Sequence, residues 1–148
     1  MDTSAAADQP ARLSDDTALT AHLETLLQGA LRRQFWMIFL DEEGEELGPV
    51  MPCDDLPPDP RGLARGQGPG ARPPAEVLAH WIAGLMDEFE VAQVVFVWER
   101  RGGRRIGEDE RVWARELGRA CVHEAVRVRA QFLLHDRGLR VLAPDDYL

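Results

Sequence analysis

The most chemically distinctive stretch of the chain is an arginine-rich loop. It has the sequence ERRGGRR, residues 99–105, and lies between an apolar run and an acidic segment. Arginine donates paired hydrogen bonds to phosphate and carboxylate groups, and glycine allows the backbone to approach a ligand closely. The loop therefore predicts a site for an anionic ligand. Its candidate residues are Arg100, Arg101, Arg104, Arg105, Glu99 and Glu110.

A second interpretation of the same loop needs no ligand. Glu108, Asp109 and Glu110 begin the following helix and place three carboxylates at the positive end of its dipole. These carboxylates would repel an anion bound there, and Arg104 and Arg105 can pair with them locally. The loop is then a solvated, self-neutralising turn, as runs of charge often are.

Two functions fit these residues. The chain has no G-x-S-x-G, Walker or H-E-x-x-H motif and no cysteine cluster. This favours a non-catalytic α/β binding or interaction module without a metal or cofactor, whose partner is an unknown protein or a small anionic ligand.

The alternative is a hydrolase that acts on a phosphorylated or acidic substrate. The four arginines would hold that substrate, and Glu99 or Glu110 would serve as base if burial raised its pKa towards neutrality.

The charge distribution bears on nucleic-acid binding. The chain has a net charge of −9, but residues 91–148 carry 11 arginines against 9 acids. Arg111, Arg115 and Arg119 are predicted to form an exposed row on one helix, and this row together with the arginine loop would be the surface for nucleic acid. The acidic total makes this the weakest hypothesis.

Composition predicts one domain in the cytoplasm. The chain has 148 residues, of which 45% are hydrophobic, enough for one substantial core. No apolar run approaches the roughly 20 residues of a membrane helix, and no signal peptide is recognisable. Cys53 and Cys121 show no motif spacing, which is typical of a reducing compartment.

Hydrophobic periodicity predicts how the loop is positioned. The expected order is α-β-β-α-β-α-β-β, a single-domain layered α/β fold with a mixed sheet. The helices are expected at 15–32, from 74 to 89 and from 108 onward, and the strands at 35–40, 45–51, 94–98, 128–134 and 139–142.

Three further expectations concern segments outside this pattern. Residues 1–13 are predicted to be a mobile N-terminus, and 14–148 to form the domain. The Pro/Gly-rich segment 52–73 is predicted to be a disordered surface loop. Apolar residues of the second helix, including Val77, Trp81 and Phe89, are expected to cover one face of the sheet.

The element order and several residue types resemble the RadC-like branch of the JAB/MPN domains. The resemblance covers roughly residues 35–142. It is carried by FLDEEG at 39–44, PAEV at 74–77, the buried strand, the basic glycine loop, the acidic helix start and the next buried strand. It implies an α/β sandwich, in which active members hold zinc with a His-x-His pair and an aspartate.

The motif positions of that family differ in this chain. Val97 and Glu99 stand at the His-x-His positions, and Gly107 and Glu110 stand at the Ser and Asp of the S-x-x-D motif. Gln131 or its neighbours replace the Asp-His pair. Catalytic zinc needs three protein ligands. The resemblance therefore implies a metal-free relative that has kept the scaffold.

Overall fold

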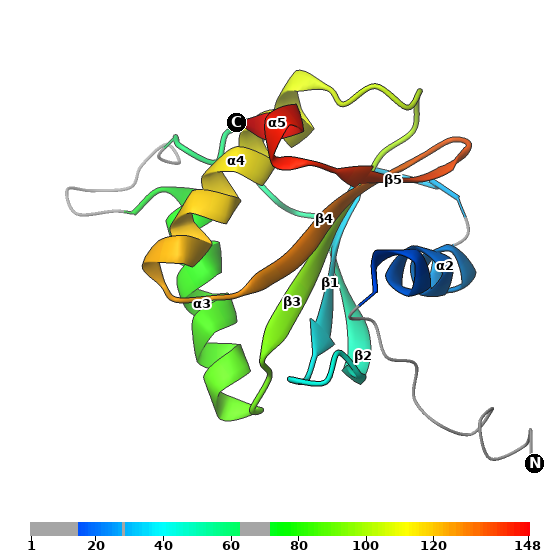
Figure 1. The fold of residues 1–148 in the computed structure, drawn as a ribbon. Helices are drawn as coiled ribbons and strands as arrows, with labels where there is room; N and C mark the ends of the chain where they lie inside the picture. Colours follow the sequence, from blue (N-terminus) through cyan, green and yellow to red (C-terminus); the bar gives the residue numbers. More distant parts are fainter. Residues whose placement is uncertain (1–14, 28, 63–71) are drawn as a thin grey trace, which may run out of the picture.

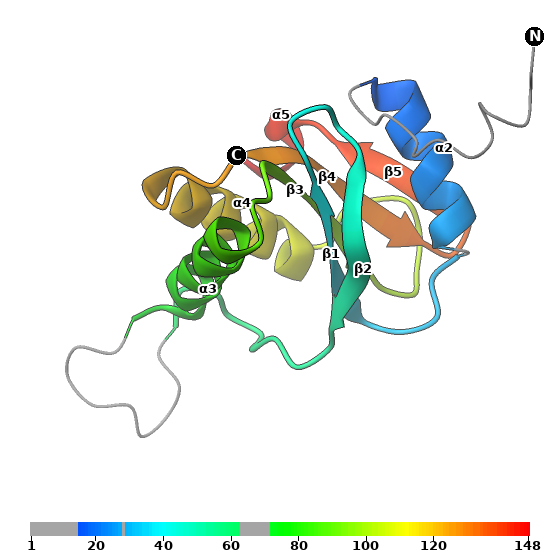
Figure 2. The ribbon, with the colours of Figure 1, turned by 90° about the horizontal axis from the view of Figure 1, so that it is seen from below.

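The structure is a computed structural model, and it describes residues 15–27, 29–62 and 72–148. A sheet lies between α3 and α4 on one face and α2 on the other (Figures 1 and 2). The predicted mobile segment 1–13 lies outside the described residues. The elements are α2 Asp16–Leu26, β1 Gln34–Leu40, β2 Glu46–Cys53, α3 Pro74–Glu88, β3 Gln93–Glu99, α4 Glu108–His123, β4 Val128–His135, β5 Gly138–Leu142 and α5 Pro144–Tyr147.

The sheet has five strands in the order β2-β1-β3-β4-β5. Only β3 and β4 pair in parallel, because α4 carries the chain back between them, whereas the other pairs are antiparallel. The predicted layered α/β fold with a mixed sheet is confirmed, as is the predicted element order. The sequence did not predict the one-turn helix α5 that follows.

The central strands are buried on both faces. In β1, Phe35 and Met37 belong to the core beneath α3 and α4, whereas Ile38 and Leu40 belong to the core beneath α2. Alternate residues of a strand face opposite sides of the sheet, so a continuous apolar run supplies both cores. All seven residues of β3 are buried, and the carboxyl end of this strand is therefore a rigid starting point for the arginine loop.

Helix α2 is shorter than the predicted helix over residues 15–32. Asp15 caps its start, since its Oδ1 accepts a hydrogen bond of 2.9 Å from the Thr17 N–H. The helix ends at Leu26 because Leu27 is extended, with φ −117° and ψ 97°. The predicted C-terminal end was wrong: the N–H groups of Leu31 and Arg32 donate to Glu99 instead of continuing a helix.

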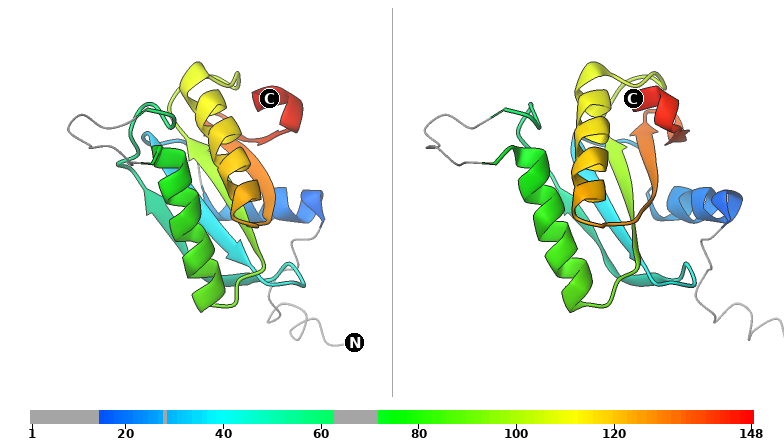
Figure 3. Two further views of the ribbon diagram at one scale, coloured as in Figure 1. Left: turned by 90° about the vertical axis from the view of Figure 1, so that its left-hand side faces the viewer. Right: turned by 60° about the vertical axis from the view of Figure 1, so that its left-hand side comes forward.

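The expectation that the whole apolar stripe of α3 covers the sheet was also wrong. Val77, Trp81 and Phe89 are 53%, 46% and 63% exposed. Helix α3 lies beside α4 on the same face of the sheet, and a helix in such a layer buries one narrow side (Figure 3). The buried side is made by Ala75, Ala79, Ile82 and Met86.

The part of the proline-rich segment that the structure describes is anchored to the domain. The Pro57 carbonyl accepts a 2.9 Å hydrogen bond from the Trp113 indole, and the Pro60 carbonyl accepts one of 3.1 Å from the Ala75 N–H. Leu56 packs against the main core. The prediction of disorder was therefore wrong for residues 54–62. Its remainder, 63–71, lies outside the described residues.

Within the described ranges, none of the helices combines the length and apolar character needed to cross a bilayer.

Candidate functional site

The arginine loop lies at the carboxyl end of the parallel pair of strands. Glu99, the last residue of β3, is in register with Leu134 near the end of β4. The Arg100 N–H donates to the Leu134 carbonyl at 3.1 Å, and the Asp136 N–H donates to the Gly102 carbonyl at 3.0 Å. The loop is therefore joined to the β4–β5 turn. The carboxyl ends of parallel strands are the usual place for ligands in α/β sheets.

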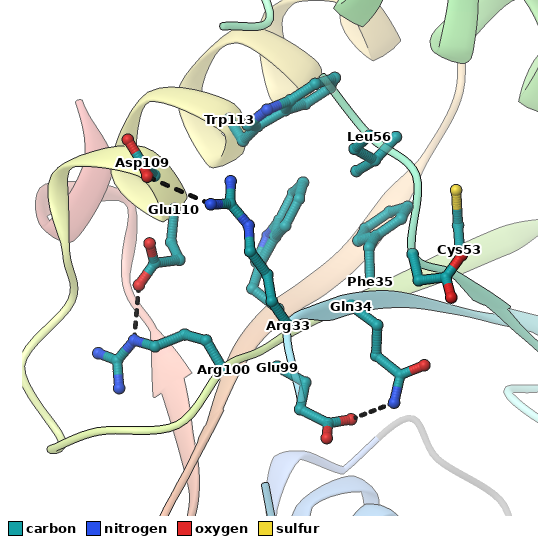
Figure 4. A pocket seen from close by; sticks show the side chains of 12 residues that line it. Arg33, Gln34, Phe35, Cys53, Leu56, Glu99, Arg100, Asp109, Glu110 and Trp113 are labelled. Carbon is teal, nitrogen blue, oxygen red and sulfur yellow. Dashed lines mark hydrogen bonds and ion pairs between the residues drawn. The ribbon is translucent and has the colours of Figure 1, made fainter. Parts of the chain in front are cut away.

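Arg100 stabilises the loop from within. Its Nε donates to Glu110 at 2.6 Å, and its two terminal nitrogens donate to the carbonyls of Gly103, at 2.6 Å, and Arg105. Its side chain is only 16% exposed and that of Glu110 17% (Figure 4). Arg100 and Glu110, both predicted ligand residues, thus already satisfy each other and the loop backbone.

The carboxylate of Glu99 is also used in structural hydrogen bonds. Glu99 is 4% exposed, and its Oε2 accepts hydrogen bonds from the N–H groups of Leu31 at 2.7 Å and Arg32 at 3.1 Å. Its Oε1 accepts from the Gln34 amide at 2.9 Å and the Trp36 indole at 2.8 Å.

The hydrogen bonds of Glu99 determine its protonation. Burial acts to raise the pKa of the carboxyl, but the hydrogen bonds outweigh it, so the pKa lies below that of an ordinary glutamate. A general base that works near neutral pH needs a raised pKa. Glu99 has neither the pKa nor a free oxygen for the role of base that the hydrolase alternative gives it.

The three acids at the start of α4 each have an arginine partner. Glu108 pairs with Arg111 at 2.8 Å, and Asp109 pairs with Arg33 at 3.4 Å. Glu110 pairs with Arg100. The predicted pairing of Arg104 and Arg105 with these carboxylates is therefore wrong, and the acids do not neutralise those two arginines.

Arg104 and Arg105 are the exposed cations of the loop. Both side chains are exposed, and within the ranges that the structure describes their guanidinium groups make no hydrogen bond or ion pair. Arg101 differs, because its Nε donates to Asp136 at 2.6 Å although its side chain is 68% exposed. This hydrogen bond lowers the pKa of the Asp136 carboxyl, which stays ionised.

A hollow of about 720 Å³ opens between the loop and the β4–β5 turn. We call it the arginine hollow. Its lining residues are Gly102, Gly103, Arg104, His135, Asp136, Arg137 and Leu139. Gly102 has φ +120°, a conformation that favours glycine, and a Cβ at Gly103 would meet no atom within 4 Å. The loop backbone is therefore open to a ligand on this side.

The residues of the hollow from the β4–β5 turn were not predicted to belong to a site, and His135 and Arg137 are the two among them that can donate to an anion. His135 is 6% exposed, and burial together with the nearby Arg100 and Arg104 guanidinium groups lowers its pKa. Its Nδ1 accepts a 3.3 Å hydrogen bond from the Arg137 N–H, which places the ring proton on Nε2. The available signal was positional: His135 ends the strand that pairs in parallel with β3, and Arg137 follows that strand.

A second, smaller cleft lies between β1, β2 and α4. It is lined by Arg33, Cys53, Leu56 and Trp113 among others, and its cavity volume is about 40 Å³ (Figure 4). This is room for little more than a water molecule. The arginine hollow is therefore the better candidate for a ligand.

We expect Arg100→Ala to open the loop. Three loop and helix groups (the Glu110 carboxylate and the Gly103 and Arg105 carbonyls) lose their donor, so the free energy of unfolding should fall by about 2 kcal/mol. The backbone amides of residues 101–106 should exchange with deuterium faster. Arg101→Ala is the matched control, because among the described residues its exposed side chain bonds to Asp136 of the turn and not to the loop backbone, and exchange in the loop should rise much less than in Arg100→Ala. Unchanged exchange in Arg100→Ala would contradict the bracing role.

The positions matched to the zinc ligands of the JAB/MPN domains have other partners here. The Gln131 side chain accepts a hydrogen bond of 2.8 Å from the Trp98 indole and donates one of 3.1 Å to the Ala114 carbonyl. Glu99 and Glu110 are engaged as described above. In residues 15–27, 29–62 and 72–148, no three His, Cys, Asp or Glu side chains are grouped to hold a metal ion.

No protein-family model matches the chain, and no curated protein matches it.

Proposed function

We propose that the protein is a non-catalytic binding module that holds an anionic group of its partner in the arginine hollow. The observation that supports this proposal is that the loop arginines differ in their contacts. Arg100 braces the loop and Arg101 joins it to the turn, whereas Arg104 and Arg105 are exposed. Exposed guanidinium groups on a braced loop are pre-organised to bind an anion, since the loop need not order on binding.

The chemistry of the hollow favours phosphate or carboxylate. Arg104 and Arg137 enter it from the loop and the turn, and the adjacent glycine backbone leaves room for an oxygen-rich group. His135 lies below them with a lowered pKa and is neutral near pH 7. A neutral His135 can donate its Nε2 proton to an anion without adding a further charge to the arginine cluster.

The two glutamates that the hydrolase alternative needs as a base are both engaged in the fold, which supports a module without catalysis. Glu99 stays ionised in a closed set of hydrogen bonds, and Glu110 is paired with Arg100. The same proposal accommodates the resemblance to the RadC-like branch of the JAB/MPN domains: the chain would be a metal-free relative that uses the end of the same β-loop-α-β unit for binding.

The test is a titration with inorganic phosphate followed by the amide resonances of the protein. The resonances of Gly102, Gly103 and the 136–138 turn should shift, and added salt should weaken the binding. Replacing Arg104, Arg105 and Arg137 together by alanine should weaken binding at least tenfold, because each guanidinium contributes a charge-assisted hydrogen bond. Arg32, Arg61 and Arg72, exposed elsewhere, supply the matched triple replacement, which should bind like the wild type.

Two results would contradict the proposal. One is a set of phosphate-induced shifts outside the loop and turn. The other is equal binding by the wild type and the Arg104, Arg105 and Arg137 variant.

A further inference from the structure

A second hollow surface lies between α4 and α5, two helices that lie close to each other in Figure 3. We call it the α4–α5 groove. It encloses about 660 Å³ and is lined by α4, the first residues of β4, the end of β5 and α5. It shares no lining residue with the arginine hollow. Any ligand it holds is therefore additional to the proposed anion.

The groove has apolar walls that are open to solvent. Val122 of α4 is 77% exposed, Val141 of β5 is 52% exposed and Leu148 is 68% exposed. Exposed aliphatic side chains that gather along one depression mark a surface for a partner, whereas single ones are ordinary. Because all three are more than half exposed, the depression is a trough. A trough suits an extended segment better than an enclosed small molecule.

One cation that lines the groove, Arg115, has a buried nitrogen, its Nε, without a hydrogen-bond acceptor among the described residues. Its neighbours on the same helix differ: Arg111 pairs with Glu108 at 2.8 Å and Arg119 with Glu116 at 3.7 Å. A buried donor without an acceptor destabilises a protein, and one that faces a groove is explained by an acceptor supplied from outside.

The row of arginines predicted on α4 is thus not one continuous cationic surface. Two of its members have acidic partners, and the third lies among valines. A nucleic acid needs several exposed cations spaced along its backbone. Arg119 and Arg129 also line the groove and pair with Glu116 and Asp16. Arg115, beside the aliphatic side chains, therefore complements a carboxylate next to an aliphatic residue.

We propose that the α4–α5 groove docks an extended segment of a partner protein in which an acidic residue adjoins aliphatic residues. The carboxylate of the segment accepts hydrogen bonds from Arg115, and its aliphatic side chains cover Val122 and Val141. Binding then satisfies the buried Nε and removes the apolar wall from water.

The experiment is a selection of random dodecapeptides displayed on phage against the whole protein. Enriched peptides should carry Asp or Glu within two positions of Leu, Ile or Val. Their affinity, measured by fluorescence anisotropy, should fall at least tenfold in Arg115→Gln and in Val122→Glu. Val122 is exposed and glutamine keeps a polar group at position 115, and thermal melting followed by circular dichroism should confirm that both variants fold.

Two matched variants control for charge and for surface change. Arg127→Gln removes an exposed arginine near the groove, and Val77→Glu adds a charge to the exposed side of α3. Both should bind the selected peptides like the wild type.

Three outcomes would overturn the proposal. The first is a selection that enriches no peptide over a column without protein. The second is a set of peptides that depend on Arg104 and Arg105 and not on Arg115, which would assign them to the arginine hollow. The third is displacement of the peptides by a single-stranded oligonucleotide whose own binding depends on Arg115.

Discussion

Replacing Glu99 with alanine should lower the free energy of unfolding by about 3 kcal/mol. The substitution removes the acceptor of four donors: the N–H groups of Leu31 and Arg32, the Gln34 amide and the Trp36 indole. These hydrogen bonds are part-buried, and a donor that is shielded from water and loses its acceptor costs more than the hydrogen bond itself contributed. Urea denaturation followed by circular dichroism measures the change.

Glu24→Ala is the control for the loss of a glutamate. Glu24 is an exposed residue of α2, and its replacement should change the free energy of unfolding by less than about 0.5 kcal/mol. A Glu99→Ala protein within this same range would show that the four donors find acceptors elsewhere, and the anchoring role of Glu99 would be wrong.

The free energy of unfolding should also depend on pH because of Glu99. The pKa of Glu99 is lower in the folded protein than in the unfolded chain. The folded state therefore favours the ionised form, and this stabilisation is complete above the unfolded pKa of about 4.3 and is lost as the pH falls through the folded pKa. In Glu99→Gln the free energy of unfolding should fall less steeply over this acidic range than in the wild type.

Glu99 also explains why the end of α2 could not be predicted. The leucine spacing of residues 19–31 is a local signal and continues past the true end of the helix. The competing interaction comes from Glu99, 68 residues after Leu31 in the chain. Local periodicity predicted the other long elements well, because β1, β3 and α4 have buried faces that their own sequences specify.

The same distinction applies to the candidate site. The position of the arginine loop after β3 and before α4 followed from the pattern of apolar and acidic residues. The roles of the individual arginines did not follow from this pattern. Arg100 is held by backbone carbonyls, and Arg101 is held by Asp136, 35 residues later in the chain. Arg137 lines the hollow because β3 and β4 pair in parallel, and this pairing could not be predicted from the local pattern.

Replacing Trp113 with alanine should lower the free energy of unfolding by about 4 kcal/mol, since it leaves a large cavity in the main core. Trp113 is 2% exposed, and its ring centroid lies 6.0 Å from that of Trp98. Trp98 in turn stacks at 4.4 Å on Phe35. The loss of packing therefore extends to Trp98 of β3, directly before the arginine loop. Thermal and urea denaturation should both show it.

Trp113→Phe separates packing from the hydrogen bond to Pro57. Phenylalanine keeps most of the ring but cannot donate to the Pro57 carbonyl, so a smaller loss of about 2 kcal/mol is expected. Deuterium exchange should rise at the Ala75 N–H, whose acceptor is Pro60 in the same segment. Trp81→Phe, at a position 46% exposed, should change neither stability nor exchange appreciably. If Trp113→Phe leaves the Ala75 exchange rate unchanged, the packing of Leu56 and the hydrogen bond of Pro60 hold residues 54–62 without the indole, and the anchoring role of the Trp113 hydrogen bond is wrong.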